Sequence, residues 1–212
     1  MRHRLAPVVL AATATCACSA GTLDRERAAS LIAATDGFNR EAHFTIRTDA
    51  PMQSAFECLA QAEVERVPLH RFAAERGWVR YETREATLGF GKKAFCPAMA
   101  LTTTGQAASA AWTRGRVASA SEGVAWSIPI GRREVLGEPR VTTLPDESAQ
   151  LEFDWKWTPN DVGMALRNSV DRAALFFDQR RTGRASCRRF DEDWRCQLAL
   201  WTAAEDAGEF QP

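Results

Sequence analysis

The sequence predicts an α+β protein, with a helical N-terminal half that includes a small β wing, followed by an antiparallel sheet of about five strands. Two patterns indicate this class. Apolar residues recur at helical spacing through much of the first part of the chain, and apolar and polar residues alternate strictly over residues 151–158. A third sign is the pair Cys187 and Cys196, which brackets a hairpin near the C-terminus.

The chain begins with a segment typical of a secretory leader. Arg2 and Arg4 are followed by a mostly apolar run over residues 5–14 and then by small residues. Such a run is too short to cross a bilayer, for which about 20 residues are needed. We therefore expect residues 1–17 to be a signal peptide.

The small residues that end at a cysteine resemble a bacterial lipobox over residues 15–19, although no leucine stands three positions before either Cys16 or Cys18. The resemblance implies lipidation of Cys18, with residues 18–22 as the anchor linker. The implied location is the periplasmic side of the cell envelope, and the lack of an aspartate after Cys18 favours the outer membrane. Ordinary signal cleavage and an uncleaved anchor are the alternatives.

The first predicted domain, residues 23–112, holds most of the helices. Helix 22–35 ends at Asp36-Gly37, and helix 51–64 carries an apolar stripe that includes Met52 and Phe56. The remaining predicted elements are a third helix at 69–75 and strands at 43–48, 78–83 and 98–102.

The second predicted domain, residues 113–202, is the antiparallel sheet. Pro129 and Gly137 divide its first part into two strands, because proline favours a strand end and glycine a turn. The predicted elements are strands at 124–130, 134–144 and 151–158, short helices at 161–167 and 171–177, and a hairpin at 184–201. The polar tail, residues 203–212, is expected to fray.

Two wider resemblances follow. The three helices, Gly77-Trp78-Val79 and residues 100–105 look like a winged-helix layout over about residues 51–110, which implies a scaffold here. The whole chain also resembles small, uncharacterised lipoproteins of proteobacterial envelopes, at residues 27–32, 101–105, 153–160 and 190–195. That group implies a cellular setting and no activity.

Four cysteines lie outside the leader: Cys58, Cys96, Cys187 and Cys196. An even number in an exported chain predicts disulfides. A two-residue turn at residues 191–192 would place Cys187 opposite Cys196 at about 4.5–5.5 Å, within the range that disulfides accept. Cys58 and Cys96 then pair with each other. Zinc binding is disfavoured because there is no C-x-x-C motif.

Candidate catalytic and binding residues all have a simpler interpretation. Glu152 and Asp154 share one strand face and are expected to be solvated, while His43 and His70 lack a visible nucleophile. Trp155 and Trp157 fit a hydrophobic core better than a ligand groove. Six arginines alternate with acids, which favours a solvated, internally paired face: Arg180, Arg181, Arg184, Arg188, Arg189 and Arg195, among Asp178, Asp191, Glu192 and Asp193.

The composition also bears on partners. Lys and Arg number 27, as do Asp and Glu, so loss of the leader with its two arginines leaves a net charge of −2. A chain without a basic face is not expected to bind nucleic acid. We expect a non-enzymatic, lipid-anchored binding or scaffolding protein without a cofactor, with the membrane and an envelope protein as partners. The alternative is a small-ligand-binding protein or an enzyme whose site the sequence does not reveal.

Overall fold

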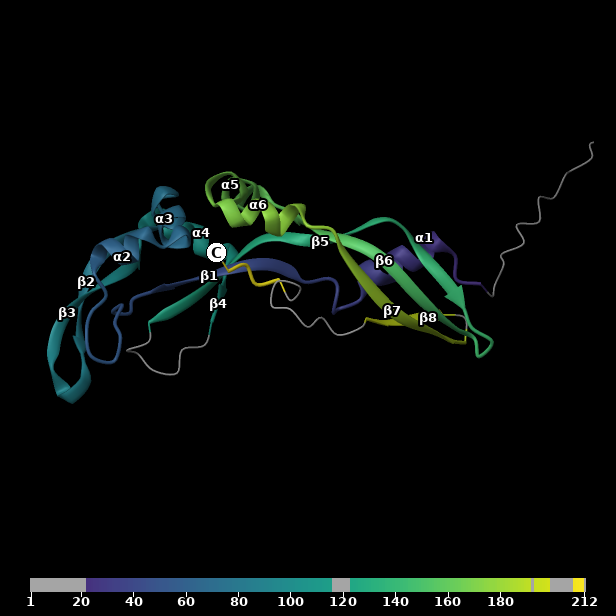
Figure 1. Ribbon diagram of the computed structural model, residues 1–212, viewed down its shortest axis with the longest axis horizontal. Coiled ribbons are helices and arrows are strands. Elements are labelled where there is room, and N and C mark those ends of the chain that lie inside the picture. Colours follow the sequence, from purple (N-terminus) through teal and green to yellow (C-terminus); the bar gives the residue numbers. More distant parts are fainter. Residues whose placement is uncertain (1–21, 116–122, 192, 199–207, 212) are drawn as a thin grey trace, which may run out of the picture.

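The computed structural model describes residues 22–115, 123–191, 193–198 and 208–211. A long, curved antiparallel sheet forms the body, and a two-stranded hairpin projects from one end of it (Figure 1). The strand order of the sheet is β1-β5-β6-β7-β8, and β4 also pairs with β5.

The bounds of the elements are as follows. The sheet contains β1 (Glu41–Thr48), β4 (Thr113–Arg114), β5 (Val124–Thr143), β6 (Ser148–Pro159), β7 (Arg181–Phe190) and β8 (Asp193–Leu198). The separate hairpin consists of β2 (Val79–Thr87) and β3 (Lys93–Leu101). The helices are α1 (Arg25–Ala34), α2 (Gln61–Arg66), α3 (Pro68–Glu75), α4 (Thr103–Ala108), α5 (Asp161–Ser169) and α6 (Asp171–Asp178), with 3₁₀ turns η1 (Gly89–Gly91) and η2 (Ser109–Ala111).

The predicted fold class, a helical, winged-helix-like half followed by a sheet, is wrong. The structure is mostly β, with scattered helices. β1 belongs to the main sheet and pairs with β5 from Glu41↔Arg132 to Thr48↔Val124. One hydrophobic core accordingly contains residues from both sides of position 112, including Phe44 and Ile128. The alternation over residues 43–48 predicts a strand, but its partner lies too far along the chain to be recognised from local pattern.

The two strands predicted at 124–130 and 134–144 are one strand of 20 residues, β5. The pairing with β1 is irregular beside Pro129, between Ala42 and His43, and the pairing with β6 is irregular between Leu136 and Arg140, where Gly137 has φ +66°. Such irregularities accommodate a proline or a left-handed glycine without ending the strand. Residues that predict breaks therefore bend β5 instead.

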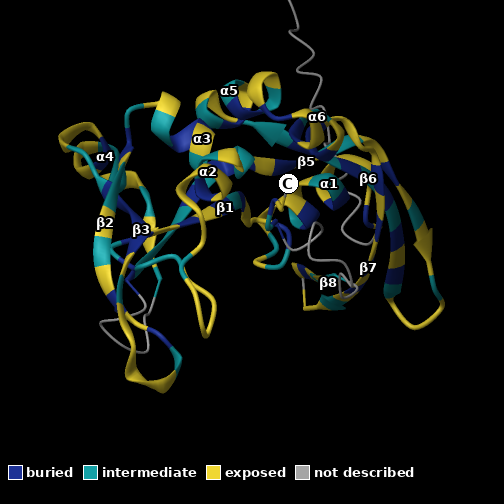
Figure 2. Cartoon of the chain, turned by 60° about the vertical axis from the view of Figure 1, so that its left-hand side comes forward, coloured by how far each residue is buried: buried dark blue, intermediate teal, exposed yellow. Residues whose placement is uncertain are grey.

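The core lies on the face of β6 that carries Leu151, Phe153, Trp155 and Trp157, as the alternation predicts, and all four side chains are buried. Phe176 of α6 stacks on Trp157 with ring centroids 5.8 Å apart. Phe38, in the loop after α1, makes edge-to-face contacts with Phe153 and Trp155. Figure 2 shows buried and exposed positions alternating along β6.

The prediction that the tail frays is wrong for residues 208–211. Phe210 is 3% exposed, and its ring centroid lies 5.4 Å from that of Phe176. The backbone N–H of Phe210 donates to the carbonyl of His43 (2.8 Å), and the N–H of His43 donates to Gly208 (2.7 Å). One aromatic residue thus secures this segment, although its neighbours in the sequence are polar. Residues 203–207 and 212 lie outside the described part.

Candidate functional site

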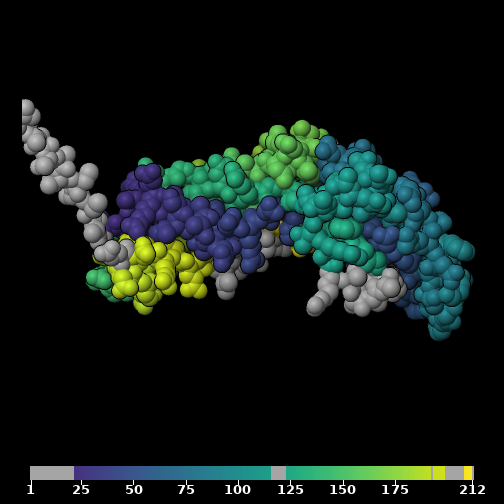
Figure 3. Space-filling model, turned by 180° about the vertical axis from the view of Figure 1, so that it is seen from behind, coloured from purple at the N-terminus to yellow at the C-terminus, as the bar shows by residue number. Residues whose placement is uncertain are grey.

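The most distinctive surface is the projecting hairpin β2–β3 together with the loop of residues 51–60 that packs along it; we call these residues the docking arm. It extends beyond the body at one end (Figures 1 and 3). The hairpin register runs from Val79↔Leu101 at its base to Thr87↔Lys93 at its tip. Val79 and Met99 belong to the main core, whereas the distal half has only a small cluster of its own, formed around Ala86, Leu88 and Cys96.

The loop of residues 51–60 corrects the prediction of a helix over 51–64. Of residues 51–64 only the end is helical, as the start of α2. Pro51 forms a bridge with Ala98 of β3, and Gln53 and Cys58 form a bridge within the loop. The N–H of Met52 donates to Pro97 (2.7 Å), and that of Leu59 donates to Met52 (3.0 Å). Helical spacing of apolar residues is misleading here, because the backbone groups of the loop bond to β3 at Met52 and to one another between Met52 and Leu59.

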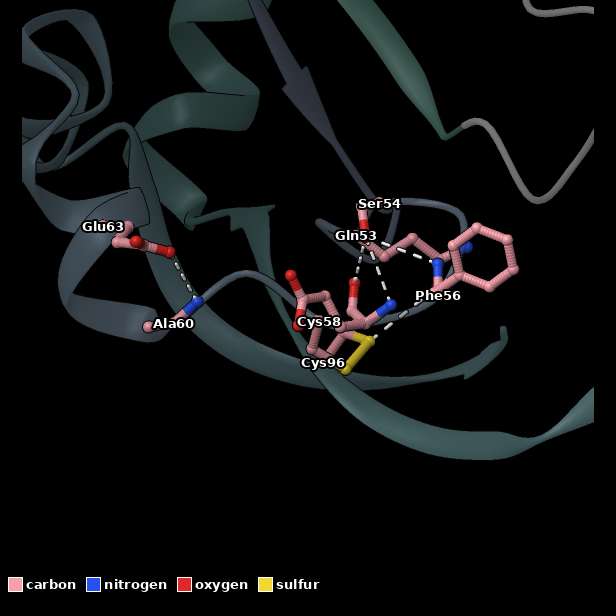
Figure 4. Close-up of a disulfide and its surroundings, with 8 residues drawn as sticks. Gln53, Ser54, Phe56, Cys58, Ala60, Glu63 and Cys96 are labelled. Atoms are coloured by element: carbon pink, nitrogen blue, oxygen red, sulfur yellow. Dashed lines mark hydrogen bonds between the residues drawn. A yellow bond between two sulfur atoms is a disulfide. The ribbon is translucent and has the colours of Figure 1, made fainter. Parts of the chain in front are cut away.

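A disulfide between Cys58 and Cys96 fixes the loop to the hairpin (Figure 4). The Ser54 hydroxyl accepts from the N–H of Glu57 (3.2 Å), and the N–H of Gly89 donates to the carbonyl of Ala55 (2.7 Å). The loop is therefore attached near the tip as well as along its length. The second disulfide joins Cys187 to Cys196, and the predicted register of that hairpin, from Phe190↔Asp193 to Cys187↔Cys196, is confirmed.

Large apolar side chains are exposed at the tip of the docking arm. Phe56 is 67%, Phe90 102% and Phe95 74% exposed. The rings of Phe56 and Phe90 lie 6.0 Å apart. Phe90 adopts φ 59°, a conformation uncommon for a residue other than glycine, and the turn thereby presents its ring to solvent. A Cβ at Gly89 would lie 2.5 Å from Phe56, so glycine is needed for this packing.

The docking arm is tied to the body by an ion pair midway along β2 and by aromatic contacts at its base. Arg84 pairs with Asp49 (2.7 Å) and Glu82 (2.6 Å), and its hydrogen bond to Glu82 raises the pKa of the guanidinium. Trp78, Trp112 and Trp126 form successive edge-to-face contacts, at 5.1 and 6.1 Å between centroids. These contacts hold the arm in a defined direction relative to the sheet.

Glu152 and Asp154, which the sequence predicts to share one solvated strand face, lie on the outer face of β6. Glu152 pairs with Arg140 (3.2 Å) and Arg184 (3.0 Å) on the neighbouring strands. Asp154 pairs with Arg180, whose hydrogen bond lowers the pKa of that carboxyl. A general acid needs a raised pKa, so this environment does not suit Asp154 to that role. A polar pocket of about 410 Å³ borders both residues.

His43 and His70, the two histidines considered as catalytic candidates, lie apart from these carboxylates. His43 pairs with Pro129 near the start of β5, whereas Glu152 pairs with Arg140 near its end. His43 lies in β1 and holds the C-terminal segment through its backbone. Nδ1 of His70, in α3, is 3.1 Å from the carbonyl of Val64. Burial lowers the pKa of His70, and the bond to Val64 opposes that change.

Trp155 and Trp157 are core residues, with rings 5.4 Å apart. The arginines do not form one solvated face, because Arg181 is 8% exposed and donates to the carbonyls of Phe176 and Gln179, both at 3.1 Å. Its guanidinium lies 5.3 Å from the ring of Trp155, on which Arg133 also packs at 5.1 Å. Arg181 is in phase with the buried Ala185 and Cys187 of β7, so strict alternation along this strand is the signal that could have identified it as buried.

Some residues singled out in the sequence lie outside the described part of the structure, and searches for a metal site and for a membrane-spanning helix found none in that part. Cys18 and the leader lie outside the described residues, as does Glu192. Within the described ranges no cluster of His, Cys, Asp and Glu could hold a metal ion. The helices of that same part are too short or too polar to cross a membrane.

An open pocket of about 510 Å³ was not foreseen from the sequence. It lies between α6 and the C-terminal segment, where Leu175, Phe176 and Phe210 supply apolar lining and Arg172 and Gln179 supply polar groups. The buried Phe210 forms part of its wall. A single phenylalanine in a polar tail does not predict such a pocket from the sequence.

No protein family model, curated protein or solved structure matches this chain.

Proposed function

We propose that this chain is an exported, lipid-anchored envelope protein that binds a partner through its docking arm and does not perform catalysis. The observation that carries the proposal is the exposure of Phe56, Phe90 and Phe95 on a projection fixed by a disulfide. The rings of Phe56 and Phe90 are adjacent, and exposed apolar clusters of this kind are typical of interaction sites.

The two disulfides fit an oxidising, extracytoplasmic compartment. The finer location, with lipid on Cys18 on the periplasmic side of the outer membrane, is part of the proposal. The first helix, α1, lies at the end of the molecule opposite the docking arm (Figure 1). An anchor attached just before α1 would therefore leave the arm accessible.

Photocrosslinking in intact envelopes tests the proposal. Phe95 (74% exposed), in the arm, is replaced by p-benzoylphenylalanine, and Met164 (42% exposed), on α5, serves as the matched position on the body. We expect an adduct at position 95, to a protein or to a phospholipid, and none at 164. Equal labelling at the two positions, or no adduct at 95, would contradict a docking role for the arm.

A second candidate, small-ligand binding, is favoured by the pocket beside α6. Its volume of about 510 Å³ is within the usual range for ligand sites, and Leu175, Phe176 and Phe210 give it an apolar wall. Native mass spectrometry of the protein purified from its envelope tests this candidate. A retained small molecule that is lost on Leu175→Trp supports it, and an unliganded mass contradicts it.

A further inference from the structure

We propose that the tip of the docking arm inserts between the headgroups of an anionic lipid bilayer. The tip consists of Phe56, Phe90, Lys92, Lys93 and Phe95. This inference rests on the function proposed above, in which the arm is the binding element, and it names the partner of that element.

The directions of the three phenylalanines favour a bilayer. Phe90 stands at the turn and is fully exposed, and Phe56 approaches it from the loop. Cys96 points inward to the loop through its disulfide, so Phe95, the preceding residue of β3, points to the opposite face. A flat protein surface would cover one of these faces, whereas a fluid bilayer can contact the rings on both faces and leave the Lys93–Glu85 pair, which lies on the face of Phe95, among the headgroups.

The charges next to the apex fit anionic headgroups. Lys92 and Lys93 follow the turn directly, and both are exposed. Lys93 pairs with Glu85 (2.6 Å), whereas Lys92 has no ion-pair partner within the described ranges. Lysines behind inserted aromatic rings can extend along the apolar surface and reach lipid phosphates, to which basic side chains are attracted.

The tip is held in the exposed conformation before any partner is present. The Cys58–Cys96 disulfide and the bond from Gly89 to Ala55 fix the loop, and the left-handed backbone of Phe90 places its side chain at the outside of the turn. A preorganised tip loses little conformational entropy on insertion. Phe190, at the turn between β7 and β8, differs because the guanidinium of Arg195 lies 5.3 Å from its ring.

The test uses the full chain and vesicles of phosphatidylethanolamine and phosphatidylglycerol. With p-benzoylphenylalanine in place of Phe90, illumination followed by mass spectrometry should detect a phospholipid adduct, with a yield about tenfold above that at the control position Met164. Equal yields at the two positions, or no lipid adduct at position 90, overturn the inference.

Two double variants identify the contributions of the tip. Phe56→Ser/Phe95→Ser should lower the adduct yield at position 90 about tenfold or more. Lys92→Gln/Lys93→Gln should lower it about fivefold per lysine in anionic vesicles and leave it unchanged in neutral ones. All four side chains are exposed, and an unchanged circular dichroism spectrum will verify the fold. Undiminished yields in both variants contradict insertion of the tip.

The outcomes separate this inference from the proposed function. A protein adduct at Phe95 in envelopes, together with no lipid adduct in vesicles, leaves the arm as a docking element and overturns the bilayer as its partner. The absence of any adduct in both experiments overturns both proposals.

Discussion

Removal of the Phe210 side chain should destabilise the whole protein, although this residue lies two positions from the C-terminus. Its ring is 3% exposed and packs edge-to-face on Phe176. Phe→Ala at buried sites typically costs about 3–5 kcal/mol. We expect about 3 kcal/mol for Phe210→Ala, the lower end, because the segment borders an open pocket and can settle into the vacated space.

Equilibrium urea unfolding with the disulfides intact measures this effect. An m-value of about 2–3 kcal/mol/M converts the loss into a midpoint decrease of about 1–1.5 M. Gln211→Ala changes the exposed neighbour and should stay within about 0.5 kcal/mol of the wild type. A loss below about 1 kcal/mol for Phe210→Ala would refute the reasoning, because the C-terminal segment would then contribute little to the folded state.

Three further outcomes are expected. Replacing Cys58 and Cys96 by alanine should lower the free energy of unfolding in urea by about 4 kcal/mol, and replacing Cys187 and Cys196 by about 2.6 kcal/mol. The first loss is larger because that disulfide closes a longer loop in the unfolded chain, with a sequence separation of 38 against 9. The reverse order would contradict this argument from loop entropy. Burial lowers the pKa of His70 in the folded protein, so the unfolded chain binds the proton more readily and the free energy of unfolding should fall as the pH drops below about 6.5. His70→Gln should reduce the difference in unfolding free energy between about pH 7.5 and pH 5.5, measured by urea titration. An unchanged difference would exclude His70 as its source. Glu152→Gln should change the free energy of unfolding by about 1 kcal/mol or less, because its pairs with Arg140 and Arg184 are solvent-exposed; a larger loss by calorimetry would indicate a stronger network.

Local pattern predicts the elements whose partners are close in sequence. The alternation of Leu151 to Trp157 identifies the buried face of β6, and the spacing of Cys187 and Cys196 fixes the register of β7 and β8. α5 begins after Asn160, whose side chain accepts from the N–H of Gly163 (2.9 Å), in agreement with the predicted helix start.

The parts that could not be predicted depend on distant contacts. Phe56 has helical spacing from Met52, but the disulfide at Cys58 and the bonds to β3 determine an extended loop. The exposure of Phe56 and Phe90 also follows from that loop, so the candidate site depends on tertiary structure that no single segment encodes. Pro129 has the same ambiguity, because only its place beside a bulge shows that the strand continues.

The pairing of β1 with β5 sets an order of events during folding. Thr48 receives the hydrogen bond of Trp126 from 78 residues further along the chain, whereas β5 to β8 pair with their neighbours in sequence. Pairing between distant segments is slow, because a long loop must close before any contact forms. As synthesis proceeds from the N-terminus, β1 with Phe44 and Ile46 emerges early and remains without its strand partner until β5 follows. An unpaired apolar strand promotes aggregation, so the newly made chain has to be shielded at β1 throughout that interval.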